Sequence, residues 1–419
     1  MTAPQESMMT MNHPAFVLNC HFNGLSIIRD LGRRGVPVYA LDARKSVGTV
    51  SRYAQFRRCP NPLVSNDQFI DFLMEMGPKF EWRPVLIPTM DQWAMAIAHA
   101  KDQLEKYYIC CVADPEVIDL CIYKQRFYEW ALERGYPVPR SWKATDWQQV
   151  PDDAYPVAAK PEFRVSATNR SDAFQRSLNY TEQRLRPLLS PIDLAAFVER
   201  HEGYLSDFLI QEYVRGLSDQ MLTIGVYADR RHEVRGLFTG RKIRGFPPDV
   251  GDCMAGESYE VPEELIDITQ SICRDIGYHG IAEFEFKRDC ESGEIKLLEI
   301  NPRTWSWVGI TPACGVSLGW MAYQDLSGMG LPTGCQRSHA KTGEVKWVRI
   351  TEDPLNCLRF NRSAGYPQWH HTLRSWWHSL EADRLVVAEF AKDDIAPGIW
   401  SVRQKIRELN LRRKSSPKL

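Results

Sequence analysis

Two short segments near residue 290 carry acidic side chains at a spacing that could hold a divalent cation. Residues 281–287 alternate strictly between apolar and polar types, as expected for a half-buried strand. One face of this strand would carry Glu283, Glu285 and Lys287. A turn follows, and residues 295–301 return with Glu299 and Asn301 on one face.

Antiparallel pairing of these two segments could bring Glu285 and Glu299 close together. Two such carboxylates repel each other unless a cation lies between them. Mg²⁺ takes oxygen ligands and is usually held by one or two carboxylates plus phosphate oxygens. Glu285, Glu299 and Asn301 are therefore candidate Mg²⁺ ligands. The alternative is a solvated hairpin face with incidental charges.

A proline and an arginine follow the second acidic segment directly. Pro302 ends the strand, so that Arg303 lies next to the acidic residues. A guanidinium beside metal-binding carboxylates can contact a phosphoryl oxygen. The alternative for Arg303 is a structural ion pair with Glu299.

The N-terminal part of the chain has the pattern of a parallel α/β layer. Short apolar strands are expected at 15–18, 36–41, 85–88 and 109–112, and helices at 26–34, 69–76 and 93–106. Strands that alternate with helices favour a parallel sheet. The first turn has only Gly24 where a dinucleotide-binding fingerprint needs three glycines. A structural Rossmann-like layer is therefore favoured over a bound nicotinamide cofactor.

Composition excludes several other classes of protein. The 419 residues are 44% hydrophobic and 25% charged, with a net charge of -1. These values are typical of a globular protein and argue against a nucleic-acid binder or a membrane-surface binder, which would usually be basic. There is no apolar run long enough to span a bilayer and no apolar leader in the polar N-terminal residues. The eleven cysteines include no CxxC pair, so reduced, buried thiols in a cytoplasmic protein are expected.

Three segments of the sequence resemble motifs of the ATP-grasp superfamily. Residues 298–303 (Leu-Glu-Ile-Asn-Pro-Arg) resemble its E-x-N-P-R motif, and residues 280–286 fit the strand that precedes it. Residues 238–248 resemble carboxylate–amine ligases of the carbamoyl-phosphate-synthase-like branch. The resemblance covers roughly residues 15–330. It implies a mixed α/β and α+β fold: a Rossmann-like pre-ATP-grasp domain at 14–119, a two-subdomain ATP-grasp domain at 120–330, and a small C-terminal extension at 331–419.

The same resemblance implies roles for individual residues. Lys124 and Lys160 match the two lysines that reach the nucleotide phosphates. The adenine hinge and ribose contact correspond to Gln211, Glu212, Tyr213, Val214 and Asp219. A basic cluster near the phosphates or the carboxylate substrate corresponds to Arg241, Lys242 and Arg244. Glu285, Glu299 and Asn301 match the metal ligands, and Arg303 matches the residue that steadies the transferring phosphoryl group.

The implied function is an ATP-dependent and Mg²⁺-dependent ligase, with Mn²⁺ as an alternative metal. It would join a carboxylate, such as an amino acid or peptide, to an amine through an acyl phosphate. Its partners would be small molecules, with neither nucleic acid nor membrane, and a homodimer is left open. Residues 162–170 lack the glycine-rich loop of many relatives, so a catalytically weak or inactive nucleotide-binding protein is the alternative. A third hypothesis is a nicotinamide-dependent oxidoreductase that uses the N-terminal domain.

Overall fold

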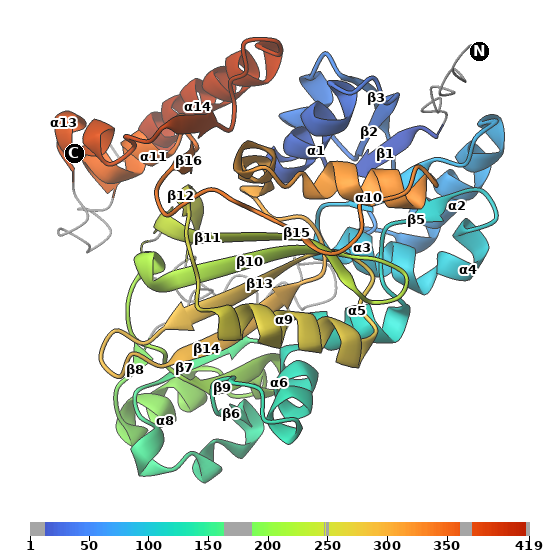
Figure 1. Cartoon of the computed structure of the whole chain (residues 1–419). Helices are drawn as coiled ribbons and strands as arrows, with labels where there is room; N and C mark the ends of the chain where they lie inside the picture. The colour runs from blue at the N-terminus through green and yellow to red at the C-terminus, as the bar shows by residue number, and fades with distance from the viewer. Residues whose placement is uncertain (1–12, 163–186, 247, 249–250, 361–370, 416–419) are drawn as a thin grey trace, which may run out of the picture.

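The computed structural model describes residues 13–162, 187–246, 248, 251–360 and 371–415 (Figure 1). The N-terminal part is a five-stranded parallel sheet with strand order β3-β2-β1-β4-β5. Its strands are β1 (Ala15–Leu18), β2 (Val38–Asp42), β3 (Ala54–Arg58), β4 (Val85–Pro88) and β5 (Ile109–Cys110). Its helices are α1 (Phe22–Gly32), α2 (Asn66–Met76), α3 (Asp91–His99), α4 (Lys101–Leu104) and α5 (Pro115–Ile122). The expected parallel α/β layer is confirmed.

Helix α1 begins earlier than the sequence pattern predicts. Its polar first turn looked like a loop, but Asn23 is buried and donates from Nδ2 to the carbonyl of Thr89 at 2.5 Å. The same amide also lies 3.3 Å from the carbonyl of Thr304. Local residue type favours a turn here, and these tertiary hydrogen bonds explain why the helix extends over it.

A small antiparallel sheet follows, with strand order β6-β9-β7-β8. Its strands are β6 (Ser141–Lys143), β7 (Val157–Pro161), β8 (Pro187–Leu188) and β9 (Phe208–Glu212), and its helices are α6 (Lys124–Glu133) and α8 (Pro191–Arg200). Helix α6 agrees closely with the amphipathic pattern of its sequence, and it ends before Gly135, whose φ is +73°. The segment after Lys160 that lacks glycine lies almost wholly outside the described residues.

The largest sheet has eight strands, in the order β14-β13-β10-β11-β12-β16-β17, with β15 paired to β11. Its strands are β10 (Met221–Ala228), β11 (Val234–Phe246), β12 (Asp252–Ser258), β13 (Gly280–Arg288), β14 (Ile295–Asn301), β15 (Gln336–Arg337), β16 (Val345–Val348) and β17 (Arg384–Val387). The remaining helices are α9 (Glu263–Ile276), α10 (Leu318–Leu326), α11 (Asp353–Leu355), α13 (Leu373–His378) and α14 (Ala396–Ser415). In Figure 1 this sheet lies between the five-stranded sheet above and the small sheet below.

The C-terminal segment is built into this architecture. Strands β15, β16 and β17 all come from beyond residue 330 and join the large sheet. Farther on, Asp394 accepts a buried hydrogen bond at 2.9 Å from Nε of Arg29 on α1. A boundary at residue 330 therefore does not separate two independent cores.

Trp305 and Trp307 are buried just after β14, and glycines of the large sheet make room for them. A Cβ on Gly225 would collide with the ring of Trp305. Cβ atoms on Gly240 or Gly256 would come within 2.7 Å of the ring of Trp307. This packing holds the segment that follows β14 against the sheet.

All eleven cysteines are free thiols, and every one except Cys290 and Cys335 is buried. Among the described residues, no helix has both the length and the apolar character needed to cross a membrane.

Candidate active site

The hairpin of β13 and β14 has the register that the sequence suggests. Glu285 lies directly opposite Glu299, and Glu283 lies opposite Asn301. A register irregularity follows Glu285, before Phe286 pairs with Leu297. The alternating pattern therefore brings the acidic side chains of the two strands together at one end of the hairpin.

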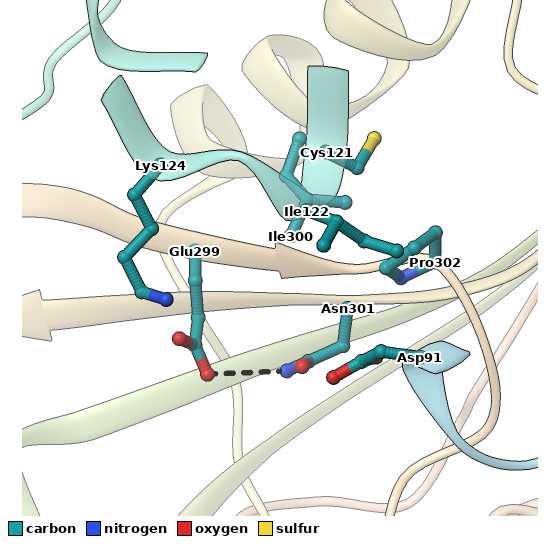
Figure 2. Close-up of a pocket in the computed structure, with 8 residues that line it drawn as sticks. All are labelled: Asp91, Cys121, Ile122, Lys124, Glu299, Ile300, Asn301 and Pro302. Carbon is teal, nitrogen blue, oxygen red and sulfur yellow. Dashed lines mark hydrogen bonds between the residues drawn. The ribbon is translucent and has the colours of Figure 1, made fainter. Parts of the chain in front are cut away.

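A small pocket that opens to solvent lies beside this hairpin. It is lined by Asp91, Cys121, Ile122, Lys124, Glu299, Ile300, Asn301 and Pro302. Figure 2 shows the Lys124 side chain extending from the start of α6 toward the carboxylate of Glu299. The pocket thus unites a predicted phosphate-binding lysine with two predicted metal ligands.

Lys242 neutralises part of the acidic cluster. Its Nζ lies 2.7 Å from Oε1 of Glu285, and both side chains are nearly buried. Burial alone would lower the pKa of Lys242, but the negative charges of Glu285 and Glu283 raise it above its usual value. Lys242 is therefore a charged ammonium that already pairs with a candidate metal ligand.

Glu283 is a third carboxylate of the cluster that the predicted ligand set omits. It accepts hydrogen bonds from Nδ2 of Asn301 at 3.0 Å and from Oγ1 of Thr223 at 3.2 Å. Burial, followed by repulsion from Glu285, raises the pKa of Glu283 to about 8. The sequence contained the signal for this residue, since Glu283 shares a strand face with Glu285. Its contact with Asn301 fixes which way the amide points, so Glu283 helps to orient a candidate ligand.

Arg303 is tied to the N-terminal α/β part of the chain. Its Nε donates to Oδ1 of Asp91 at 2.7 Å, and its Nη2 donates to Oδ1 of Asn301 at 2.8 Å. It forms a salt bridge with Asp91, which lies 212 residues away in the sequence. No local pattern marks Asp91, so sequence reasoning could not find it.

The predicted nucleotide contacts lie on the small sheet and the segment that follows it. Lys160 is buried near the end of β7. The side chain of Gln211 on β9 is buried and donates to Oγ of Ser141 at 2.9 Å. Tyr213 donates its backbone N–H to the carbonyl of Pro156 at 3.0 Å, and Val214 is buried beside it. Asp219 lies in a short 3₁₀ turn before β10.

Glu212, at the end of β9, is held by groups on both sides. Its Oε2 lies 2.9 Å from Nζ of Lys296 on β14 and accepts a hydrogen bond from the backbone N–H of Arg140 at 3.2 Å. Lys296 was not predicted, because strict alternation would put a residue five positions before Asn301 on the opposite strand face, and the register irregularity of the hairpin breaks that alternation. The ion pair links the small sheet to the large one at the expected adenine hinge.

The structure divides the expected basic cluster of β11. Lys242 alone joins the acidic hairpin. Arg241 pairs with Glu257 at 2.5 Å and lies over the ring of Tyr259. Arg244 is buried and pairs with Asp353 at 2.6 Å, in the C-terminal segment. Alternation along the strand, together with irregular pairing around Lys242 and Arg244, explains why the three side chains do not converge.

These residues fit a hydrated, phosphate-bound Mg²⁺ better than a closed metal cage. Within the ranges that the structure describes, no group of three His, Cys, Asp or Glu side chains converges as a ready-made metal site. Two carboxylates and an amide oxygen are nevertheless the hard oxygen donors that Mg²⁺ prefers, with water and phosphate completing the shell. The buried Lys242 ammonium shows that the cluster already favours a cation.

No known family model matches this sequence. It is 27% identical over 261 residues to the D-aspartate ligase of Enterococcus faecium strain Aus0004, covering 55% of this chain and 60% of that protein. It is 24% identical over 330 residues to the C-terminal section of the carbamoyl phosphate synthase large chain of Methanopyrus kandleri, covering 71% of this chain and 57% of that protein. The chain thus spans less than two thirds of either relative.

A solved structure with the same fold is the biotin carboxylase domain of the Hydrogenobacter thermophilus 2-oxoglutarate carboxylase, in complex with MgADP, ADP and bicarbonate. Its TM-score is 0.54 at 17% identity, covering 77% of this chain and 71% of that one. The resemblance to the ATP-grasp superfamily is confirmed: the sequence relatives are ligases of that superfamily, and the chain shares the fold of solved ATP-grasp structures. Within the superfamily, its sequence is related to the carboxylate–amine ligases, among them D-aspartate ligase and carbamoyl phosphate synthase.

Proposed function

We propose that this protein is an ATP-dependent and Mg²⁺-dependent ligase that joins a carboxylate to an amine. The observation that carries the proposal is the pocket in which Lys124 faces Glu299 and Asn301, beside the paired Glu285. An ammonium group on one wall and oxygen donors on the other suit a polyphosphate bound through a divalent cation.

In this proposal Glu285, Glu299 and Asn301 hold Mg²⁺, which neutralises charge on the phosphates when bound. Lys124, Lys160 and Arg303 stabilise the negative charge that develops as the γ-phosphoryl group leaves ADP. The substrate carboxylate accepts that group and becomes an acyl phosphate. The amine then attacks the acyl carbon, phosphate leaves, and an amide or peptide bond forms. No enzyme nucleophile is needed, so the cysteines take no part in the proposed chemistry.

The relationship to D-aspartate ligase supports an amino acid or short peptide as one of the two substrates. Gln211, Glu212, Tyr213 and Val214 would contact the adenine from the end of β9, with Asp219 near the ribose. In this arrangement the Glu212–Lys296 ion pair keeps the adenine side of the site attached to the metal-binding hairpin.

The test is a phosphate-release and ADP-release screen of amino acids in pairs, each assayed with ATP and Mg²⁺. Glu299→Ala should abolish release, with its circular dichroism spectrum unchanged. Unchanged turnover in this variant would remove Glu299 from the proposed metal set.

The glycine-free segment after Lys160 favours one alternative, a nucleotide-binding protein with little or no ligase activity. That protein would bind Mg²⁺ with ADP in calorimetry and yet release no phosphate with any pair of substrates. Absence of nucleotide binding would contradict both the ligase and this alternative.

A further inference from the structure

The guanidinium of Arg303 is held on several sides by fixed oxygen atoms. Nε and Nη2 face the two carboxylate oxygens of Asp91 at 2.7 and 3.5 Å. Nη2 also donates to Oδ1 of Asn301 at 2.8 Å, and Nη1 donates to the carbonyl of Thr304 at 3.0 Å. Contacts from two directions fix the plane of the guanidinium as well as its position.

Asp91 is well placed to act on Arg303. It is the first residue of α3, directly after the turn that follows β4, and a carboxylate in the first turn of a helix interacts favourably with the helix dipole. The exposed fractions of the Arg303 and Asp91 side chains are 13% and 14%, so the pair is largely shielded from solvent. Asp91 also lines the same pocket as Lys124, Glu299 and Asn301.

A chain of hydrogen bonds connects Asp91 to the acidic hairpin. Asp91 accepts from Arg303, Arg303 donates to Oδ1 of Asn301, and Nδ2 of Asn301 donates to Glu283. This series of hydrogen bonds therefore runs from the N-terminal α/β part, through Arg303 and Asn301, to Glu283 in the large sheet. Displacement of Asp91 would release Arg303, whereas Asn301 keeps its hydrogen bond to Glu283.

We propose that Asp91 is a positioning residue for phosphoryl transfer: the N-terminal α/β part of the chain uses it to hold Arg303 in place for the γ-phosphoryl group. This inference rests on the proposed function, because it takes Arg303 to contact that group. It also gives the N-terminal part a direct role in the nucleotide site.

The experiment compares two nucleotides, both with Mg²⁺, by isothermal titration calorimetry on the full chain. The β,γ-imido analogue of ATP carries a γ-phosphoryl group, and ADP does not. Asp91→Asn should weaken binding of the analogue by about tenfold, the lower end of the effect of losing a partner that orients a site residue. Binding of ADP should be unchanged, because the residues that hold the β-phosphate are intact. A general loss of structure would weaken both nucleotides.

A double-variant cycle tests whether Asp91 acts through Arg303. In an Arg303→Gln background, Asp91→Asn should have no further effect on binding of the analogue, since there is no guanidinium left to position. Asp91→Glu, which keeps the charge, should recover part of the affinity that Asp91→Asn loses. The matched control is Asp393→Asn, which removes an aspartate–arginine pair of the same 2.7 Å length, to Arg33, outside the pocket.

The results separate this inference from the proposed function. If the wild-type protein binds neither nucleotide, the ligase proposal fails and the Asp91 inference fails with it. If the wild-type protein binds both, and Asp91→Asn binds the analogue equally well, only the Asp91 inference is overturned. Tighter binding of the analogue by Asp91→Asn would also overturn it, because Asp91 would then withhold Arg303 from the phosphate.

Discussion

Nζ of Lys242 lies 2.7 Å from Oε1 of Glu285, and no more than 11% of either side chain is exposed. The lysine ammonium therefore occupies a place beside a carboxylate that the proposed function assigns to Mg²⁺. Two cations close to one carboxylate repel each other. The Lys242 ammonium should therefore lower the affinity of Glu285 for the metal ion, and a bound metal ion should weaken the Lys242–Glu285 ion pair.

Replacement of Lys242 by glutamine should make the fold depend on Mg²⁺. The change leaves the carboxylate of Glu285 buried without its cation, which should cost about 3 kcal/mol of unfolding free energy. Added Mg²⁺ should then raise the melting temperature of the variant by more than that of the wild-type protein. Arg241→Gln is the matched control, since Arg241 lies on the same strand but pairs with Glu257. An equal effect of Mg²⁺ on all three proteins would contradict this prediction.

Replacement of Lys160 by methionine should weaken ATP binding without loss of the fold. Methionine keeps much of the apolar stem but removes the charge, and loss of a charged hydrogen bond to phosphate corresponds to about a tenfold rise in KM for ATP. Steady-state kinetics measure the change. Lys143→Met, at an exposed position of β6 in the same sheet, should keep the wild-type KM. A wild-type KM in Lys160→Met would place that lysine outside the nucleotide site.

Replacement of Arg244 by glutamine should lower stability and leave nucleotide affinity unchanged. Arg244 pairs with the buried Asp353, which also accepts a hydrogen bond from Nε1 of Trp376 at 2.7 Å. Loss of the arginine leaves an uncompensated buried carboxylate, which should cost about 3 kcal/mol. Denaturant unfolding and calorimetry with MgADP measure the two effects. A large loss of nucleotide affinity in a folded variant would contradict this prediction and show that Arg244 contributes to the nucleotide site.

Stability should fall in mild acid because of His279. This imidazole is buried near the start of β13, where Nδ1 lies 3.3 Å from the carbonyl of Val112. Burial lowers the pKa of His279 from 6.5 to about 4. The unfolded chain therefore takes up a proton below pH 6.5 while the folded protein does not, and the loss approaches about 3 kcal/mol as the pH reaches 4.

The check is denaturant unfolding of the wild-type protein and His279→Gln at several pH values between 7 and 4. Glutamine has no titratable group, so the stability of the variant should fall less steeply over this range. Parallel curves for the two proteins would show that His279 does not contribute to the acid sensitivity.

The local patterns of this sequence predicted the local parts of the site. Strict alternation identified the two strands of the hairpin and predicted that Glu285 and Glu299 are neighbours across them. This was possible because the two-residue period of a strand does not depend on the rest of the fold. Asp91 was missed because its contact with Arg303 depends on how the N-terminal layer packs against the large sheet. The division of Arg241, Lys242 and Arg244 was missed for a related reason: irregular strand pairing redirects neighbouring side chains.

The boundaries of helices show the same limit. The first turn of α1 carries residues that favour a loop, and its buried Asn23 bonds to Thr89 only in the folded protein. The strands beyond residue 330 could not be assigned to the large sheet from their sequence, since short strands do not specify their partners. Features set by local sequence patterns could therefore be predicted, whereas contacts between segments distant in the sequence could not.

The participation of β16 and β17 in the large sheet has a practical consequence for dissection of this protein. Truncation after residue 330 would strip β12 of its neighbour and leave its N–H and C=O groups as an open edge, a template for aggregation. The same cut would take away Asp394 and Asp353, leaving two buried arginines without their counter-ions. Deletion experiments aimed at the nucleotide site should therefore keep the chain through at least Asp394.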